Sequence, residues 1–405
     1  MFKLILIGVG CQGFTVEQAG MLARCGLIVG DTRHLALLKE IAVKKQAISP
    51  LAPALETIRL ALADGDVGVL ASGDPLFFGI GRRLLKEFGQ EQLTVFPALS
   101  TMQEACARFK LPWDDMQMVS LHGRKTLHGP GLLLAGEKTF AFTDRHNTPA
   151  LLARQLVDYL ELIEADDLLA QCWVHVAENL GSAEERLFSG TLAEAAVQDF
   201  AELNVLIVTR PRTAEESAPV FGLTEEEIAH SRGLITKDEV RAVTLHALRL
   251  PNTGVFWDLG AGSGSISVAA ARLQPGLTVF AVDQHPEAFA NVKKNIRQFG
   301  CYNIIPIQGE APAVLRSLPD PDRVFIGGSG GNLSAIIGQA AKRLPAEGRM
   351  VVNGVIGQTV AEAPQCMADH GLKVELTRVQ IERTTFPETV PGKVLNPITV
   401  MTGRK

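Results

Sequence analysis

The stretch Val255–Ser265, which reads Val-Phe-Trp-Asp-Leu-Gly-Ala-Gly-Ser-Gly-Ser, constrains the fold of this chain more than any other. It begins as a short apolar run, which indicates a buried strand. Glycines follow at the alternate positions 260, 262 and 264, and a helical pattern starts at Ile266. Because glycine lacks a Cβ, the backbone can turn sharply and lie against a ligand, with N–H groups of the next helix pointing toward it. The stretch therefore predicts a strand, a ligand-binding turn and a helix.

Acidic residues on either side of this turn indicate the kind of ligand. A second apolar run, Leu277–Val282, ends at Asp283, about 20 residues beyond the glycines. A carboxylate at the end of the second strand suits a ribose, because it can accept both hydroxyl hydrogens. The alternating glycines, with Asp258 before them, resemble the first motif of Rossmann-type S-adenosylmethionine-dependent methyltransferases. A dehydrogenase motif is the nearest alternative.

Composition narrows the classes of protein that this chain can be. A length of 405 residues predicts two or three domains, and a net charge of −5 argues against binding nucleic acid by bulk electrostatics. The six cysteines are scattered without a Cys-x-x-Cys pair, which predicts neither a metal site nor a disulfide framework. The apolar run at the N-terminus is too short for a signal peptide, and no segment is long enough for a membrane span. We expect a cytoplasmic protein that binds neither membrane nor nucleic acid.

The first half of the chain opens with another glycine turn. A strand is predicted at Leu4–Gly8, and Gly8–Gly13 contains Gly-x-Gly-x-x-Gly. Thr15 is expected to cap the next helix, and a second strand ends at Asp31. Taken alone, these features predict a dinucleotide site.

A polar loop at Ser72–Gly79 follows another buried strand of this half. Gly73 permits a sharp turn, and the proline after Asp74 restricts that residue to an extended conformation. Open α/β sheets bind ligands at the carboxyl ends of their strands, so this loop is expected to line a site. Farther along, Ser100 or Thr101 is expected to cap a helix and to leave N–H groups free nearby.

The first half resembles the tetrapyrrole methylase family, and within it the precorrin C5-methylase branch. The resemblance rests on Ile-Gly-Val-Gly, Val-Gly-Asp-Thr-Arg, Ala-Ser-Gly-Asp-Pro-Leu-Phe, Ala-Leu-Ser-Thr-Met-Gln-Glu-Ala-Cys-Ala-Arg and Ser-Leu-His-Gly-Arg, in this order. It covers residues 1–210 and implies two α/β subdomains, about 1–112 and 113–210. S-adenosylmethionine then binds between the subdomains, and the first glycine turn is structural or faces the substrate. The implied cofactor contacts are Gly73, Asp74, Phe77, Ser100 and Thr101. Cys11-Gln12 departs from the family, where proline, glycine or an acid is frequent, so the shape of that turn is left open.

The polar, proline-containing stretch 211–221 is the predicted linker, and 222–405 is the predicted second domain. Thr236 and Glu239 match a capping box, so a helix is expected to start there. Two further strands end in polar or glycine-rich segments, and the glycines would let a large flat substrate approach the backbone. These segments are Gly309-Glu310-Ala311 and Gly327-Gly328-Ser329-Gly330-Gly331.

This second half resembles the decarboxylating precorrin methyltransferase domain over about residues 222–400. The resemblance rests on Ile-Thr-Lys-Asp-Glu-Val-Arg, Trp-Asp-Leu-Gly-Ala-Gly-Ser-Gly-Ser, Ala-Val-Asp, Gly-Glu-Ala-Pro and Phe-Ile-Gly-Gly-Ser-Gly-Gly. It implies a Rossmann-type methyltransferase with a mostly parallel seven-stranded sheet that an antiparallel strand pair completes. The implied S-adenosylmethionine contacts are Thr236, Gly260, Ala261, Gly262, Ser263, Gly264, Asp283, Glu310 and Ala311.

Together the resemblances imply methylation of a reduced tetrapyrrole at C5 and C15, with loss of the ring C acetate carboxylate, in vitamin B12 synthesis. Such a substrate carries many carboxylates, which basic side chains bind. The candidates on position are Arg232, Lys237, Arg241 and Arg383, and the flat face of the substrate would lie against Gly327–Gly331. We name no catalytic base and expect no metal, and we expect a homo-oligomer.

Two functions from other classes remain open at this point. Gly8–Gly13 together with Asp31 favours a pair of NAD-dependent dehydrogenase domains. A non-catalytic tetrapyrrole carrier could retain degenerate methylase domains, although intact glycine motifs in both halves argue against it.

Overall fold

A computed structural model describes residues 2–123, 126–213, 216, 218–387 and 392–405 of this chain. Contacts divide the chain into two compact units. The first unit contains Met1–Lys125, Lys138–Ala153 and Trp173–Thr209, and the second contains Thr126–Glu137, Arg154–Cys172 and Arg210–Lys405. The second unit therefore includes two segments from the first half of the chain. Residues 214–215 and 217 of the predicted linker lie outside the described residues.

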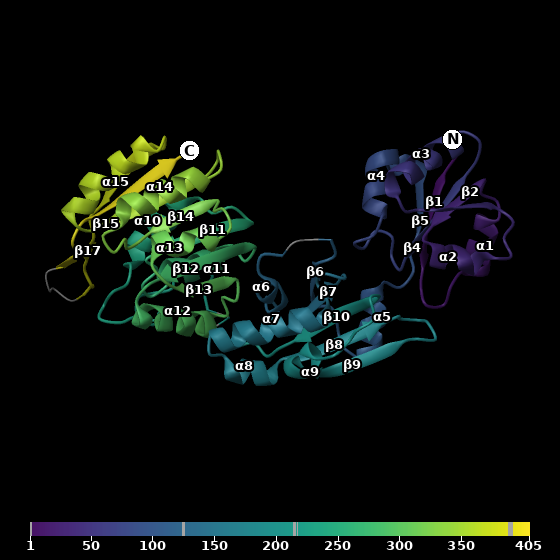
Figure 1. The fold of residues 1–405 in the computed structure, drawn as a ribbon, viewed down its shortest axis with the longest axis horizontal. Helices are drawn as coiled ribbons and strands as arrows, with labels where there is room; N and C mark the ends of the chain where they lie inside the picture. The colour runs from purple at the N-terminus through teal and green to yellow at the C-terminus, as the bar shows by residue number, and fades with distance from the viewer. Residues whose placement is uncertain (1, 124–125, 214–215, 217, 388–391) are drawn as a thin grey trace. The chain divides into compact units, whose positions relative to one another are not determined.

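A parallel five-stranded sheet with the order β3-β2-β4-β1-β5 forms the N-terminal part of the first unit (Figure 1). Its strands are β1 (Leu4–Val9), β2 (Leu27–Gly30), β3 (Lys44–Ala47), β4 (Val67–Ser72) and β5 (Leu93–Phe96). Its helices are α1 (Val16–Leu22), α2 (Thr32–Leu35), α3 (Leu51–Ala61) and α4 (Gly81–Phe88), with the 3-10 turns η1 (Ala36–Leu38) and η2 (Gln90–Gln92). Leu4 and Leu6 of β1 belong to one apolar core and Ile7 to another, because both faces of the sheet are covered.

The second sheet of this unit is mixed and has the order β6-β7-β10-β8-β9, with β6 parallel to β7 and the other pairs antiparallel. Its strands are β6 (Gln117–Ser120), β7 (Lys138–Phe142), β8 (Trp173–Glu178), β9 (Arg186–Thr191) and β10 (Asn204–Thr209). The helices in this part of the chain are α5 (Thr101–Phe109), α6 (Gly129–Leu133), α7 (Pro149–Leu162), α8 (Asp166–Gln171) and α9 (Leu192–Ala196). Met102 and Cys106 of α5 pack against Phe140 of β7, so α5 belongs to the core of this sheet.

A seven-stranded sheet with the order β13-β12-β11-β14-β15-β19-β16 forms the centre of the second unit. The first five strands are parallel, and β19 runs antiparallel to both β15 and β16, which confirms the predicted sheet. The strands are β11 (Gly254–Leu259), β12 (Leu277–Asp283), β13 (Ile304–Gln308), β14 (Arg323–Ile326), β15 (Arg349–Gly354), β16 (Lys373–Val379) and β19 (Ile398–Arg404), with the separate pair β17 (Glu382–Arg383) and β18 (Lys393–Val394).

Helices cover both faces of this sheet: α10 (Asp238–Leu248), α11 (Ser265–Leu273), α12 (Pro286–Phe299), α13 (Ala311–Val314), α14 (Leu333–Arg343) and α15 (Gly357–Asp369), with the 3-10 turn η4 (Leu315–Ser317). Because strand side chains alternate, Val255, Trp257 and Leu259 pack into one core with α14 and α15. Asp258 faces the opposite side and contacts Ser267 of α11. Within the described ranges, each helix is too short or too polar to traverse a bilayer.

Buried polar contacts fix the two early segments within the second unit. The Tyr159 hydroxyl of α7 donates a hydrogen bond of 2.8 Å to the carbonyl oxygen of Ile304 in β13. His128, before α6, donates from Nε2 to the carbonyl oxygen of Tyr302 at 2.8 Å. Burial lowers the pKa of His128 to about 4, so the ring is neutral at pH 7.

Two of the three predicted helix caps are present. Thr15 and Ser100 cap α1 and α5 through complete capping boxes, as the sequence predicts. The capping box predicted at Thr236 and Glu239 is wrong, because α10 begins at Asp238 and has no side-chain cap. The Glu239 carboxylate instead accepts hydrogen bonds from Arg383 of β17. The capping box would have used the same carboxylate to accept an N–H at the start of the helix.

Candidate active sites

The glycine turn after β11 meets the loop after β14 at the carboxyl edge of the seven-stranded sheet. The strand order reverses between these strands, which is where open α/β sheets bind ligands. Gly260, Gly262 and Gly264 have φ angles of +68°, +57° and +75°, which favour glycine. A Cβ on Gly260 would lie 2.4 to 2.6 Å from backbone atoms of Gly328, so the loops touch through bare backbone. A Cβ on Gly262 would meet no described atom within 4 Å, which makes Gly262 the open side of the turn.

Asp283 holds this turn from the end of β12. Its Oδ2 accepts a hydrogen bond from the N–H of Gly262, and its Oδ1 accepts one from the N–H of His285, both at 2.9 Å. The residue is 8% exposed, and its oxygens keep further lone pairs that could accept ribose hydroxyls. The structure thus gives Asp283 a role in shaping the turn that the sequence did not reveal, and the ribose contact stays a prediction.

Asp258 is enclosed directly beneath the turn. Its Oδ2 accepts a hydrogen bond of 2.5 Å from the Ser267 hydroxyl, and among the described residues Oδ1 has no partner. The pKa of Asp258 is raised to about 7, mainly by burial and to a smaller extent by the nearby Asp283, while the bonds from Ser267 act in the opposite direction. The carboxyl group is therefore partly protonated near neutral pH.

The ends of β13 and β14 are joined by a side-chain contact. Asn332 donates from Nδ2 to Oε1 of Glu310 at 2.6 Å, so the predicted cofactor segment Glu310-Ala311 is tied to the glycine-rich loop. Gly327, Gly328, Gly330 and Gly331 of that loop are exposed. Sequence reasoning missed Asn332, and its position directly after the last of these glycines was the available signal.

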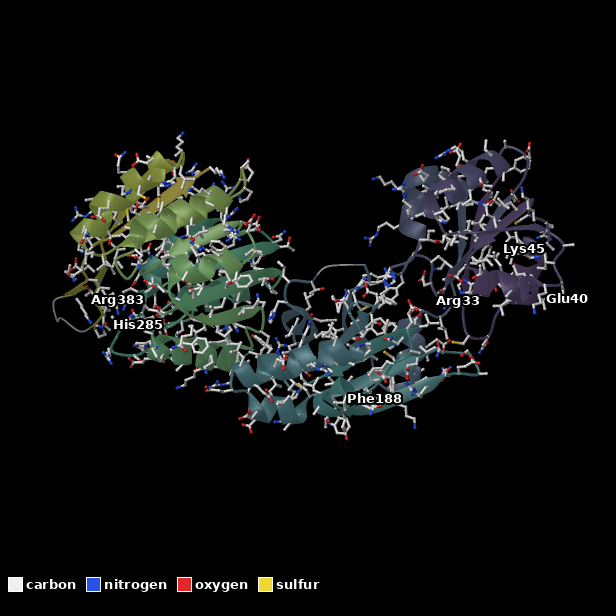
Figure 2. All side chains as sticks on the ribbon, in the orientation of Figure 1. Arg33, Glu40, Lys45, Phe188, His285 and Arg383 are labelled. Atoms are coloured by element: carbon white, nitrogen blue, oxygen red, sulfur yellow. The ribbon has the colours of Figure 1, made fainter. Side chains whose placement is uncertain are left out.

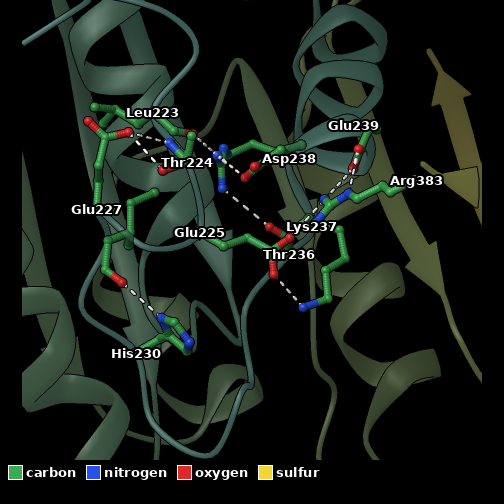
Figure 3. A network of polar contacts seen from close by, with 12 residues as sticks. Leu223, Thr224, Glu225, Glu227, His230, Thr236, Lys237, Asp238, Glu239 and Arg383 are labelled. Atoms are coloured by element: carbon green, nitrogen blue, oxygen red, sulfur yellow. Dashed lines mark hydrogen bonds and ion pairs between the residues drawn. The ribbon is translucent and has the colours of Figure 1, made fainter. Parts of the chain in front are cut away.

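A polar network surrounds Thr236 and pairs two of the predicted basic residues with carboxylates (Figure 3). Arg383 binds both oxygens of Glu239, at 2.8 and 2.6 Å, and one oxygen of Glu225 at 2.8 Å. Lys237 donates to the other oxygen of Glu225. Both cations are therefore neutralised by acids of the same unit.

The other two basic candidates differ in burial. Arg241 is 4% exposed, and its guanidinium donates to Asp238 and to the carbonyl oxygens of Leu223 and Thr236. The Arg232 side chain is 79% exposed and lies 3.2 Å from Glu287. Of the candidates, Arg232 has the side chain most accessible to a ligand, and its contact with substrate stays a prediction.

Ala261 and Ser263 complete the predicted glycine turn. The Ala261 N–H donates to the carbonyl oxygen of Val282 at 3.0 Å, which binds the turn to β12. Ser263 is 3% exposed, and its carbonyl oxygen accepts from Nδ2 of Asn295 in α12 at 2.8 Å. The structure brings these residues to the turn that carries Gly260, Gly262 and Gly264.

The first unit contains a cavity of about 300 Å³ at the carboxyl edge of its parallel sheet. Four of the predicted cofactor residues line it, namely Asp74, Phe77, Ser100 and Thr101. Phe142 of β7 also lines it and packs against Phe77, with ring centroids 6.0 Å apart. The structure therefore brings these four predicted residues to one cavity, and their contacts with a cofactor stay predictions.

Glycine lets three loops converge beneath this cavity. A Cβ on Gly8 would lie 2.0 Å from the carbonyl oxygen of Gly73, and one on Gly73 would lie 2.9 Å from the Cα of Ser100. Asp74 fixes the second loop, because its Oδ1 accepts the N–H of Leu76 at 2.8 Å. Gly8 is thus a packing residue of the sheet edge, which agrees with the structural reading of the first glycine turn.

Two further residues of this cavity, Arg33 and His34, escaped sequence reasoning, whereas Ser72 begins the loop that the sequence predicts to line a site. Arg33 and His34 lie on α2, directly after β2, and Ser72 ends β4. Because β2 and β4 are parallel neighbours, their carboxyl ends bring these side chains together. Two polar residues directly after a strand that ends in Asp31 were the available signal.

Both sites fit S-adenosylmethionine by the chemistry of their residues. In the second unit, backbone N–H donors are available at the start of α11, beside the open space at Gly262. The carboxylate of Asp283 can accept the ribose hydroxyls. In the first unit, aromatic rings and the capped start of α5 line a cavity. A bound S-adenosylmethionine would supply a methyl group that its sulfonium already activates.

Comparisons with known proteins agree with this reading. Residues 3–196 match the Tetrapyrrole (Corrin/Porphyrin) Methylases, and residues 227–392 match the Precorrin methyltransferase domain. A Sinorhizobium protein named precorrin-6Y C(5,15)-methyltransferase (decarboxylating) is 31% identical over 390 residues, which are 94% of this chain and 91% of that protein.

Two further similar proteins each match less than half of this chain. A probable cobalt-precorrin-6B C(15)-methyltransferase (decarboxylating) from Pyrobaculum calidifontis is 38% identical over 165 residues, which are 40% of this chain and 84% of that protein. A crystal structure of precorrin-6Y C5,15-methyltransferase from Geobacter metallireducens is 41% identical, covers 47% of this chain and 100% of that chain, and has a TM-score of 0.46.

The folds, their strand-end loops and these matches define a methyltransferase with a tetrapyrrole methylase part and a Rossmann-type part. The chain belongs to the family of precorrin-6Y C(5,15)-methyltransferases (decarboxylating). The matches support neither the dehydrogenase nor the non-catalytic carrier.

Proposed function

We propose that this chain methylates precorrin-6Y at C5 and C15 and removes the ring C acetate carboxylate, which gives precorrin-8X in cobalamin synthesis. One observation carries the proposal: the relative of that name is similar across 94% of the chain, so both halves of the activity are encoded together. The methyl donor at both sites is S-adenosylmethionine. The tetrapyrrole methylase domain is residues 1–210, with subdomains of about 1–112 and 113–210, and the second domain is 222–405.

The protein's part in this chemistry is mainly orientation and exclusion of water. The electron-rich macrocycle supplies the attacking carbon and can also take up electrons when the carboxylate is lost. In the second domain, Thr236, the backbone of Gly260–Gly264 and the Asp283 carboxylate bind the nucleoside, and the exposed backbone of Gly327–Gly331 lies against the flat substrate. In the first domain, Gly73, Asp74, Phe77, Ser100 and Thr101 bind the donor.

Product masses and donor stoichiometry test this proposal. The wild-type chain, incubated with precorrin-6Y and S-adenosylmethionine, should add two methyl groups and release one carbon dioxide, and calorimetry should give two donor sites per chain. Asp283→Ala should remove one donor site and stop C15 methylation while C5 methylation continues. Asp369→Asn, an exposed acid of α15, is the matched control and should change neither result.

A wild-type chain that binds no S-adenosylmethionine, or that releases an unmethylated product, would refute the proposed function. Cytoplasmic residence and homo-oligomer formation stay predictions from the sequence.

A further inference from the structure

A chain of polar contacts lies in the lining of the first unit's cavity, where β2 and β4 end. Arg33, labelled in Figure 2, donates from its guanidinium to the hydroxyl oxygen of Ser72 at 2.8 Å. The same oxygen lies 3.4 Å from Nε2 of His34. Ser72 is exposed at the end of its strand, whereas His34 is 8% exposed. One hydroxyl at the cavity wall is therefore backed by a buried imidazole and a cation.

The imidazole of His34 is held in its neutral form. Burial lowers its pKa, the nearby Arg33 lowers it further, and Asp31 opposes this effect. Of the elements packed against α2, β3 carries the charges of Lys44 and Lys45. At neutral pH the ring can therefore accept a proton.

The contacts also indicate the direction of proton transfer. Because Arg33 donates to the Ser72 oxygen, the hydroxyl hydrogen of Ser72 is free to point at Nε2 of His34. The hydrogen of the neutral ring then lies on Nδ1, which has no partner among the described residues. Loss of a proton from the Ser72 oxygen would leave negative charge beside the Arg33 guanidinium, which stabilises it.

Methylation of a bridging carbon requires a proton acceptor. C5 of a tetrapyrrole is an unsaturated C–H carbon, and when its electron pair forms the new C–C bond, the macrocycle gains one positive charge. The C–H bond must then break, so that its electron pair restores the double bond and the proton leaves. Because the methylated cation is a strong carbon acid, a weak base is sufficient to accept this proton.

We propose that Ser72 and His34 form the relay that takes this proton in the first unit, a proposal that rests on the proposed function. Ser72 receives the proton from the methylated carbon and passes its own hydroxyl proton to Nε2 of His34, which becomes an imidazolium. Ser72 is then the catalytic residue, His34 acts through it, and Arg33 stabilises the transient charge on the Ser72 oxygen.

Each acid of the cavity uses one carboxylate oxygen, Oδ1, to hold a local turn or helix start. Asp31 caps α2 by accepting the N–H of Arg33 at 3.0 Å, and Asp74 accepts the N–H of Leu76 at 2.8 Å. The hydroxyl of Ser100 is bonded to Gln103 in its capping box. In contrast, Ser72 and His34 share a contact with no role in holding a turn or a helix end.

The relay is tested by comparing Ser72→Ala and His34→Gln with wild type, using substrate that carries hydrogen or deuterium at C5. General base catalysis contributes about 100-fold or more. Each variant should therefore lower kcat for C5 methylation about 100-fold, keep KM within about twofold, and acquire a primary deuterium isotope effect that wild type lacks. In wild type, kcat should fall at low pH as His34 becomes protonated, and His34→Gln should lose this limb.

A second serine–histidine pair of the same unit provides the matched control. Ser189 of β9 lies 2.8 Å from Nδ1 of His175 and is not part of the cavity lining. Ser189→Ala should keep the wild-type kcat and isotope effect. A direct NMR titration of His34 should give a pKa below 6.5 in wild type.

Two results would overturn the relay: a Ser72→Ala chain with wild-type kcat and no isotope effect, or a change confined to KM, which would make Ser72 a binding contact only. Ser72 lies exposed at a strand end, so its variant does not depend on the tolerance of the buried His34 site. Donor binding by calorimetry and C15 methylation are measured on each chain. A wild type that binds the donor and methylates C15 but not C5 would refute the proposed function of the first half rather than the relay alone.

Discussion

At the scale of single residues, burial of Asp258, the acid of the glycine motif, makes its contribution to the stability of the fold depend on pH. The carboxyl is fully enclosed, with Ser267 as its hydrogen-bond partner. The pKa is about 7 in the folded chain and near 4 in an unfolded one. The folded state therefore binds this proton more tightly, so the contribution of Asp258 to stability is greatest below pH 4 and is lost as the pH rises toward 7.

We predict that Asp258→Asn removes this pH dependence. Relative to the variant, wild type should lose about 1.4 kcal/mol of unfolding free energy for each pH unit between about 4 and 7. Urea unfolding at several pH values, followed by the fluorescence of the buried Trp257, measures the difference. All other titrating groups are common to both chains, so a constant difference would show that Asp258 is charged throughout.

Two glycines of the same turn should respond differently to alanine. Gly260→Ala would drive a Cβ into the backbone of Gly328 and should destabilise the second unit by several kcal/mol, as overpacking does. Gly262→Ala has open space and should cost only about 1–2 kcal/mol for its left-handed φ, yet weaken donor binding at this site. Thermal unfolding and calorimetry separate the two effects. Equal stability losses would contradict the contact between the loops.

At the scale of elements, a buried ion pair forms directly after strand β10 ends at Thr209. The Arg210 guanidinium forms a two-bond fork with Glu216, at 2.9 and 2.8 Å, and lies 4.8 Å from the ring centre of Tyr302. The side chains are 2% and 6% exposed, so neither charge is solvated if its partner is removed. The fork fixes the start of the predicted linker within the second unit.

We expect Glu216→Ala to destabilise the chain by about 3–5 kcal/mol, because it leaves the Arg210 charge buried and unpaired. Glu287→Ala, which breaks the exposed pair with Arg232, is the matched control and should cost less than about 1 kcal/mol. Denaturant unfolding compares the two variants. Similar small losses would mean that water reaches Arg210 in the folded chain.

At the scale of the whole molecule, the compact units do not follow the order of the sequence. The helices α6 and α8 and the part of α7 from Arg154 onward belong to the same unit as the Rossmann-type sheet, although they come from the first half of the chain. The Tyr159 hydroxyl is buried against the Ile304 carbonyl, and the His128 ring lies edge-to-face on the Tyr159 ring at 4.7 Å. Residues of the tetrapyrrole methylase half thus stabilise the second unit.

Tyr159→Phe should therefore lower the stability of the second unit by about 1–3 kcal/mol, because a buried carbonyl oxygen loses its donor. Tyr302→Phe is the control: among the described residues its hydroxyl has no hydrogen bond, and phenylalanine keeps the ring beside Arg210. Unfolding followed at Trp257 reports on the second unit. An unchanged transition in Tyr159→Phe would argue against this packing.

Local sequence patterns were sufficient to predict an element where one short stretch contains all the residues that decide its conformation. The apolar run before Asp258 and the glycines at 260, 262 and 264 predicted β11, its turn and α11, because strand burial and positive φ are properties of neighbouring residues. Ser100 likewise predicted the cap of α5. Motif resemblance named four residues that line the cavity of the first unit, whose donor contacts stay predictions, and the comparisons confirmed the family.

Contacts between distant residues were decided only by the tertiary structure. Three contacts join strands or loops that are far apart in the chain: Gly260 with Gly328, Glu239 with Arg383, and His34 with Ser72. A sequence pattern records what each residue can donate, accept or bury. It does not record which distant residue will be the partner in each contact, because the partner depends on how the strands are ordered in the sheets.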